Sequence, residues 1–375
     1  MGEAISREIK KMKIITRYML KELGGPFFAA LLISTIILAA GNIIQTADMV
    51  MNKGVEFFQV LKVFLLFLPY VLIFTIPISV LSAVLLGFGR LSSDNEVTTL
   101  RTNGVNIYKV VFPVVICGLI VSLFSVPLND RILPESEFAA RKLLKKIGIK
   151  HPAAMLEPGV FVKGFKNYII FIHKLKGNIL EDIRIYQPRE DKPTRTIVAK
   201  RGKIISLPEE NSVKLRLMDG MADEIDSHKP DEFYKLSFED YYLTLGVEKT
   251  IDVKKIEKKA REKSIKELFA DIKTLKKDHV DVIPLLIELH KKIALAFSNL
   301  VFVIVAIPIA ITTHRREKFV GFSMAIVLFL LYWGIMLTGI TCSIRGAIPP
   351  WLGVWSANIL LFGMGIRLFY RISKK

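Results

Sequence analysis

The sequence predicts an α-helical polytopic membrane protein with six transmembrane helices, three on each side of an inserted all-β, jelly-roll-like domain. The chain is 51% hydrophobic although it carries 53 Lys and Arg and 35 Asp and Glu. Its charges are therefore crowded outside long apolar stretches. Six charge-free runs reach or approach the ~20 residues that an α-helix needs to cross about 30 Å of hydrocarbon. Soluble domains do not carry such runs.

The charge-free runs fall into two groups of three. They are Leu23–Ala47, Val63–Gly89, Val110–Asn129, Ile293–Thr313, Phe319–Ile344 and Gly346–Ile366. Between the groups, residues 130–292 hold 34 Lys and Arg and 27 Asp and Glu, which is enough chain for a domain with its own core. The predicted organisation is therefore 1–129 with spans one to three, 130–280 with the inserted domain and a linker helix, and 281–375 with spans four to six.

The basic residues outside the insertion predict the orientation. Lys and Arg in short loops near spans are retained in the cytoplasm. Of 19 such residues, 16 lie at the N-terminus, in the loops after spans two and four, or at the C-terminus. Only Lys53, Lys62 and Arg345 lie on the opposite side. We therefore expect both termini in the cytoplasm and the inserted domain outside. The positive net charge of +18 is mostly a topology signal, and no basic motif with interleaved aromatic residues indicates nucleic-acid binding.

The inserted domain has the period of β-strands. Short β-branched or aromatic segments are separated by turn formers such as Asp219-Gly220. The predicted strands are Phe161–Lys163, Tyr168–His173, Ile183–Tyr186, Thr196–Lys200, Lys203–Ser206, Val213–Met218 and Phe233–Leu245. Regular short strands without helical segments between them are typical of a β-sandwich or jelly roll.

A helical pattern follows at Lys254–Lys277. Its apolar residues recur along one side, and Ser264 with Glu267 forms a possible capping box. Two placements fit a basic amphipathic helix just before a span. It can lie on the outer membrane face, or it can pack against the β-domain.

The loop after span two, Arg90–Gly104, is the most informative short segment. Ser93 followed by Glu96 can cap a helix, Val97 and Leu100 give that helix an apolar side, and Gly104 can end it. The predicted helix, at 91–104, has the form through which transporter membrane subunits contact a separate motor. A simple connector between two spans would have the same form.

Motifs for catalysis and for cofactor binding are missing from the sequence. There is no G-x-x-x-x-G-K-[ST], G-x-S-x-G or H-E-x-x-H pattern, and the two cysteines, Cys117 and Cys342, form no C-x-x-C pair. We therefore expect a chain that is not an enzyme, has no ATPase site and needs no cofactor or metal of its own.

A succession of short motifs resembles the LptF/LptG permease family over essentially the whole chain from Met12. The motifs are Met12–Leu23, Glu96 with Leu100-Arg101 and Gly104, Leu156–Phe161, Leu217–Gly220, Glu288–Lys292, Ile307–Ile309, Pro349–Trp355 and Asn358. Two positions depart from the family pattern. No proline follows Glu288–Lys292, and Ser356-Ala357 stands where proline is common. Whether the chain is F-like or G-like, and whether it pairs with itself, stays open.

The resemblance implies a permease subunit of an ABC-type exporter of lipopolysaccharide. Its implied partners are an LptB-type ATPase that uses ATP on the cytoplasmic side, a second LptF/LptG-type permease subunit, and LptC/LptA-type bridge proteins in the periplasm. Lipid would enter between the first and fifth spans and pass to the inner face of the β-domain. Carried over to this sequence, Glu96, Leu100 and Arg101 would contact the ATPase.

The three outer-side cations are candidates for contact with lipid phosphates. Lys53, Lys62 and Arg345 depart from the positive-inside bias, and Lys62 stands just before 27 uncharged residues. An ordinary lysine or arginine that extends to the membrane surface from a helix end has the same pattern.

The leading functional interpretation is thus lipid translocation driven by a partner's ATP hydrolysis. The alternative is a membrane-anchored scaffold or sensor whose outer domain binds a protein. Six spans and a capped cytoplasmic helix exceed what a tether needs, which favours transport. A membrane-embedded transferase would need acidic or histidine residues clustered at one membrane face, and the sequence does not supply such a set.

Overall fold

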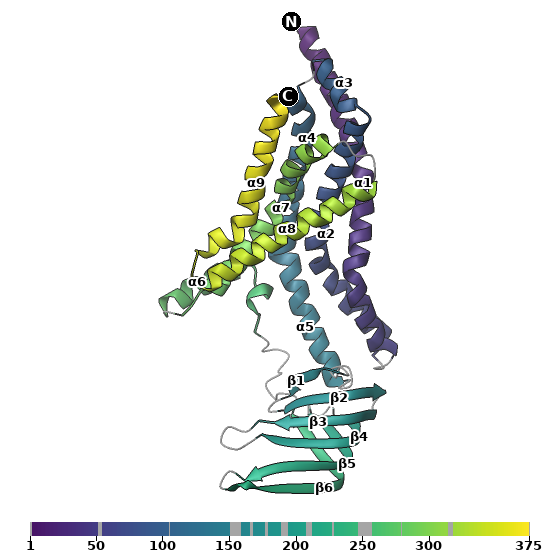
Figure 1. Cartoon of the computed structure of the whole chain (residues 1–375), viewed down its shortest axis with the longest axis vertical. Helices are drawn as coiled ribbons and strands as arrows, with labels where there is room; N and C mark the ends of the chain where they lie inside the picture. Colours follow the sequence, from purple (N-terminus) through teal and green to yellow (C-terminus); the bar gives the residue numbers. More distant parts are fainter. Residues whose placement is uncertain are drawn as a thin grey trace. The chain divides into compact units, whose positions relative to one another are not determined.

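The computed structural model of the chain describes residues 2–51, 55–104, 106–150, 159–165, 168–176, 179–188, 194–207, 212–226, 229–246, 257–278, 280–313 and 318–374. It divides into two compact units. The first comprises 1–40, 68–137 and 258–375, and it holds most of the helical chain. The second comprises 41–67 and 138–257, and it holds the β-sheet (Figure 1).

Within the described residues, six helices are long and apolar enough to cross a membrane, as predicted. They are α1 (Gly2–Met51), α2 (Phe57–Ser93), α4 (Ile107–Pro127), α7 (Ile283–Thr313), α8 (Lys318–Ile344) and α9 (Pro350–Lys374). Their most apolar windows differ sharply in burial, with 78% of the window buried in α2 and 72% in α7 but only 17% in α1 and 22% in α8. Apolar side chains that face lipid carry no penalty for exposure. The centre of the helical unit is therefore built on α2 and α7, while α1 and α8 present apolar faces outward.

The third span does not end at Asn129. A π-helical turn at Leu128–Ile132 joins α4 directly to α5 (Leu133–Lys150). The predicted boundary at 129/130 therefore lies inside a continuous helix. The boundary at 280/281 also moves, because residues 258–280 belong to the helical unit.

Three helix ends pack together in the unit that holds the sheet. Val55, Val60 and Val63, around the start of α2, are buried against Ile147 of α5, with Val50 of α1 packed alongside. Helices α1, α2 and α4–α5 are longer than a bilayer requires, with helical segments of 36, 37 and 41 residues around their apolar windows. Their surplus turns have their own apolar contacts, which a search for charge-free runs does not detect.

The described residues of the β-region form a six-stranded antiparallel sheet in the order β1-β2-β3-β4-β5-β6. The strands are β1 (Phe161–Phe165), β2 (Tyr168–Lys176), β3 (Ile179–Gln187), β4 (Arg195–Leu207), β5 (Ser212–Asp226) and β6 (Lys229–Gly246). The predicted all-β region is confirmed. Among the described strands each pairs with its neighbour in sequence, which is the order of a meander and not the Greek-key order of a complete jelly roll. Buried residues of β2 to β6, Ile183 and Leu215 among them, pack into one core.

Two predicted details of the strands are wrong. Thr196–Lys200 and Lys203–Ser206 are one strand, β4, because Gly202 continues the pairing opposite Leu180 and Leu217. Asp219-Gly220 is not a turn but lies inside β5. Asp219 has φ +54° there, and a Cβ at Gly220 would meet the ring of Phe238 on β6. The glycine lets an aromatic ring cover the strand backbone.

The linker helix is shorter than predicted and begins with the predicted cap. A 3₁₀ turn at Ala260–Glu262 precedes α6 (Ile265–Lys277), and residues 254–256 lie outside the described part of the chain. The Ser264 hydroxyl accepts from the Glu267 N–H, and the Glu267 carboxylate accepts from the Ser264 N–H at 2.7 Å. The Lys258 ammonium and the Ser264 backbone hold the pKa of Glu267 below its ordinary value.

The linker helix packs within the helical unit. Leu268 is fully buried, and the Ile265 N–H donates at 2.6 Å to the carboxylate of Asp130, which lies in the π-turn. On the same helix Phe269 is 57% exposed.

Candidate functional site

The loop between α2 and α4 holds a separate short helix, α3 (Glu96–Thr102). The predicted capping box at Ser93 is wrong, because α2 continues to Ser93 and its backbone bonds extend through Asp94 and Asn95. Asn95 precedes α3 with φ +58° and no side-chain cap bond. Asparagine tolerates this left-handed conformation, so the chain reverses there. The predicted end is confirmed, since Gly104 has φ +76° and its N–H donates to the Arg101 carbonyl at 2.9 Å.

The predicted apolar side of α3 packs on the spans. Val97 is 7% exposed and belongs to the main core of the helical unit, and Leu100 packs against that core. Met19 of α1 and Val110 of α4 are buried in the same core. A connector that only joined two spans would not need these contacts. Helix α3 is thus fastened to α1, α2 and α4.

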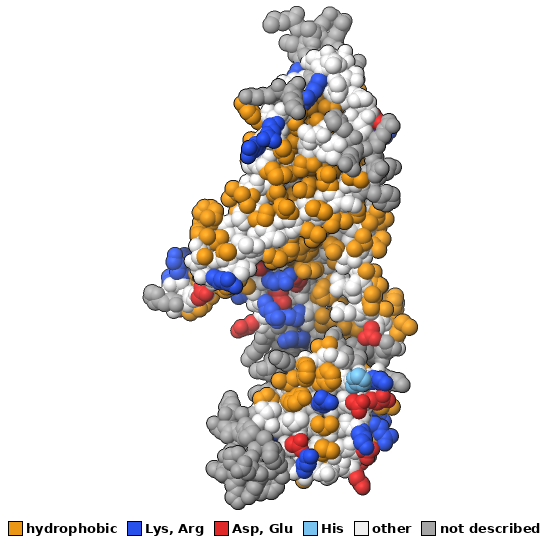
Figure 2. Space-filling model, in the orientation of Figure 1, with side chains coloured by type: hydrophobic (Ala, Val, Ile, Leu, Met, Phe, Trp, Pro, Cys, Tyr) orange, Lys and Arg blue, Asp and Glu red, His pale blue; other side chains and the backbone are white. Residues whose placement is uncertain are grey.

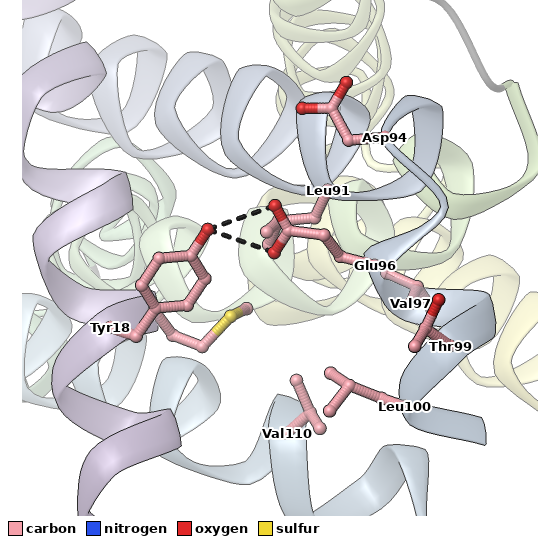
Figure 3. A pocket seen from close by; sticks show the side chains of 9 residues that line it. Tyr18, Leu91, Asp94, Glu96, Val97, Thr99, Leu100 and Val110 are labelled. Atoms are coloured by element: carbon pink, nitrogen blue, oxygen red, sulfur yellow. Dashed lines mark hydrogen bonds between the residues drawn. The ribbon is translucent and has the colours of Figure 1, made fainter. Parts of the chain in front are cut away.

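A pocket of about 290 Å³ opens between α3 and α1, and Glu96 lines it (Figure 3). Its wall residues are Tyr18, Met19, Leu91, Asp94, Glu96, Val97, Thr99, Leu100 and Val110. The Glu96 carboxylate points toward Tyr18 on α1, and Asp94 points away from it. The floor is apolar and the rim is acidic. Such a pocket suits a long basic side chain, whose stem is apolar and whose head is cationic.

A polar network surrounds Glu96. The Tyr18 hydroxyl donates to both carboxylate oxygens, at 3.1 and 3.0 Å. The Arg90 guanidinium donates to the Tyr18 oxygen at 3.2 Å and pairs with Glu22 at 2.7 Å. Tyr18, Glu22 and Arg90 were not among the predicted site residues. The i,i+4 spacing of Tyr18 and Glu22 places them on one face of α1, but nothing local indicates that this face meets Glu96.

The structure brings two of the three predicted ATPase-contact residues together and places the third elsewhere. Glu96 and Leu100 both line the pocket. Arg101 instead donates to the backbone carbonyl of Ile372, in the last turns of α9, at 3.2 Å. Cations at a helix C-terminus satisfy free carbonyls and complement the helix dipole. The structure therefore gives Arg101 an intramolecular role.

Two of the three candidate phosphate-contact residues lie within the described part of the chain. Lys53 lies outside the described residues. Lys62 has an exposed side chain near the start of α2, and Arg345 has an exposed side chain just after α8. Lys62 belongs to the unit with the sheet and Arg345 to the helical unit.

A second polar cluster surrounds Lys292, at the end of the Glu288–Lys292 motif. Lys292 is 3% exposed, and its ammonium donates to the Asn129 carbonyl at 3.0 Å. The Asn129 amide donates to the Ser125 carbonyl at 2.9 Å. The π-turn disturbs the regular ladder of α4, and Lys292 of α7 donates to a carbonyl within it. Lys292 thus joins α7 to the junction of α4 and α5.

Another ion pair in the same unit joins Arg261 to Glu137 at 3.0 Å. Its guanidinium also stands over the Tyr70 ring, 5.5 Å from the centroid. These contacts tie the segment before α6 to α5 and α2.

Comparison with known proteins relates the chain to one family. The family model described as lipopolysaccharide export system permease LptF/LptG matches residues 17–371. The lipopolysaccharide export system permease protein LptF of Escherichia coli (strain K12) is 21% identical over 359 residues, which cover 95% of this chain and 94% of that protein. An uncharacterized protein of Rickettsia prowazekii (strain Madrid E) is 26% identical over 289 residues, which cover 74% of this chain and 78% of that protein.

Proposed function

Because the chain belongs to the LptF/LptG permease family of the lipopolysaccharide export system, we propose that it is the membrane subunit through which a separate, LptB-type ATPase drives lipopolysaccharide out of the inner membrane. The observation that carries the proposal is the family match over residues 17–371, which spans all six helices and the sheet. The match covers residues 17–371 of 375, whereas a scaffold would need only an anchor and a binding domain.

The motor contact is proposed at the pocket beside α3. Glu96 stands on its rim, and apolar side chains form its floor. A Lys or Arg side chain of the ATPase has the matching chemistry, with an apolar stem and a cationic head. Of the 19 basic residues outside the insertion, 16 lie at the N-terminus, in the loops after spans two and four, or at the C-terminus, which supports a cytoplasmic location for this pocket. The sheet would then lie in the periplasm, beside LptC/LptA-type bridge proteins.

The exposed faces of α1 and α8 suit a second permease subunit and the entering lipid. Figure 2 draws a broad apolar surface over the spans, and on α8 Val327, Leu330 and Leu331 are 61%, 60% and 49% exposed. On α1, Leu32 and Ile37 are 64% and 59% exposed. Exposure of apolar side chains to lipid carries no free-energy penalty in a bilayer. These faces can therefore replace lipid contacts with contacts to a protein partner at little cost in free energy.

Purification from gently solubilised membranes tests the proposed function. We expect the tagged chain to bring down a P-loop ATPase and a second permease chain, and we expect lipopolysaccharide release from spheroplasts to stop when the chain is depleted. A scaffold or sensor would bring down no ATPase and leave release unchanged, which would refute the proposal.

A cysteine at Ser212 in β5 should react with a membrane-impermeant thiol reagent in intact spheroplasts, and one at Ser373 should not.

Contact with lipid phosphates is proposed for Lys53, Lys62 and Arg345. Replacing all three with Gln is expected to weaken binding of phosphorylated lipid A at least tenfold more than binding of a dephosphorylated analogue, because each lost cation removes a charge-assisted hydrogen bond. Binding of both lipids to the purified chain in detergent measures this ratio. Single variants separate Lys62 from Arg345. An equal loss for the two lipids, or no loss, would contradict the proposed contact.

A further inference from the structure

We propose that Tyr18 is a positioning residue for the motor contact, whose hydroxyl holds the Glu96 carboxylate and ties α3 to the first span. The proposal rests on the proposed function, since it takes Glu96 as the group that meets the ATPase. Tyr18 and Glu96 are 78 residues apart in the chain, and Figure 3 shows the phenol of α1 directed at the carboxylate of α3.

The hydrogen-bond chemistry leaves Glu96 oriented but still available. A phenol has one proton, which is shared here between two carboxylate oxygens at 3.1 and 3.0 Å. An ionised carboxylate has about four lone-pair sites, so both oxygens keep capacity for another donor. Tyr18 therefore fixes the direction of the carboxylate without blocking a Lys or Arg side chain that enters the pocket.

Arg90 and Glu22 support Tyr18 from the other side. Arg90 of α2 donates to the phenolic oxygen at 3.2 Å, and Glu22 of α1 pairs with Arg90 at 2.7 Å. A donor on the hydroxyl oxygen polarises the O–H bond, which strengthens its donation to Glu96. The four side chains form one chain of polar contacts that connects α1, α2 and α3. Glu22 balances the charge of Arg90, so that the guanidinium does not compete for Glu96.

Tyr18 connects this chain of polar contacts to the first span, α1. Most of α1 is exposed, with 17% of its apolar window buried, but Met19 and Leu23 are 1% and 8% exposed. Tyr18 thus lies beside buried residues of a helix whose apolar window is mostly exposed. Movement of Glu96 on ATPase binding is transmitted to α1 through a hydrogen bond. The proposed lipid entrance is on the same helix.

Tyr18→Phe removes one oxygen and keeps the ring. In the full transporter reconstituted in proteoliposomes, we expect the amount of lipopolysaccharide exported per ATP hydrolysed to fall about three- to tenfold. We expect a value near the lower end of this range because Tyr18 is 42% exposed, and solvent weakens the contribution of its hydrogen bond. The yield of assembled complex should change less than twofold. Combining Tyr18→Phe with Glu96→Gln should lower the ratio no further than Glu96→Gln alone, because both act through one bond. Tyr108→Phe, at a 48% exposed tyrosine on neighbouring α4, is the matched control.

Several outcomes would overturn this inference. One is an unchanged export ratio in Tyr18→Phe, with or without a loss of complex yield. Another is additive loss in the double variant, which would mean that Tyr18 acts independently of Glu96. Failure of the proposed function itself is distinguishable, since Glu96→Lys would then leave export unaffected and no ATPase would purify with the chain.

Discussion

Glu96→Lys is expected to abolish coupling between the ATPase and export while the chain inserts and folds normally. The substitution replaces an acceptor with a cation at the rim of the pocket, beside the hydroxyl of Tyr18. Loss of one member of a charged pair at an interface costs on the order of 2 to 5 kcal/mol, or roughly 30-fold to several thousandfold. Charge reversal adds repulsion to that loss. Export per ATP hydrolysed, measured in proteoliposomes, reports the effect.

The control is Glu135→Lys, which makes the same charge change at an exposed glutamate elsewhere in the helical unit. Glu135 is exposed near the start of α5 and is not among the pocket residues. We expect normal coupling from this variant. Normal complex assembly together with normal export in Glu96→Lys would remove Glu96 from the mechanism. Equal losses in both variants would indicate a general effect of added positive charge.

Lys292→Met is expected to destabilise the helical unit by about 3 kcal/mol. Lys292 is 3% exposed, and its removal leaves the Asn129 carbonyl without this donor. It also removes the positive charge that acts on the carboxylates of Glu288, Asp130 and Glu137. Breaking a buried charge network by deleting one partner costs about 3 to 5 kcal/mol, and we take the lower end because Glu137 keeps its pair with Arg261.

The neighbouring lysine supplies a close control for this prediction. Lys291 makes a 3.5 Å pair with Glu288 one turn earlier on α7, and its side chain is 22% exposed. Lys291→Met should cost at most about 1 kcal/mol. Thermal unfolding of the purified chain in detergent compares the two. Equal stability of Lys292→Met and the parent chain would show that the junction at the π-turn does not depend on this ammonium.

Features that depend on a short stretch of chain were predictable from the sequence. Each span needs only about twenty uncharged residues in a row, so the six helices follow from the charge-free runs. The cap of α6 needs only Ser264 and Glu267, three positions apart, and the end of α3 needs only Gly104. In these cases the residues that make the structure are neighbours in the chain, and their spacing is the signal.

The errors occurred where a distant partner overrides a local preference. Ser93 has the pattern of a cap, but packing carries α2 through it and moves the reversal to Asn95. Asp219-Gly220 has the pattern of a turn, but pairing with β4 and β6 keeps it inside a strand. Turn and cap preferences are worth about 1 kcal/mol, which is less than a row of strand or helix contacts supplies.

The six spans, the inserted β-region and, through its motifs, the family could be predicted from the amino-acid sequence. Which side chains meet at the candidate site could not, because it depends on tertiary contacts. Tyr18 reaches Glu96 across 78 residues, Lys292 reaches Asn129 across 163, and Arg101 reaches Ile372 across 271. Hydrophobic period and charge distribution specify which segments become helices, but the partner of a polar side chain depends on which helices pack together and on their rotation. Those are set by the fit of all the apolar faces at once.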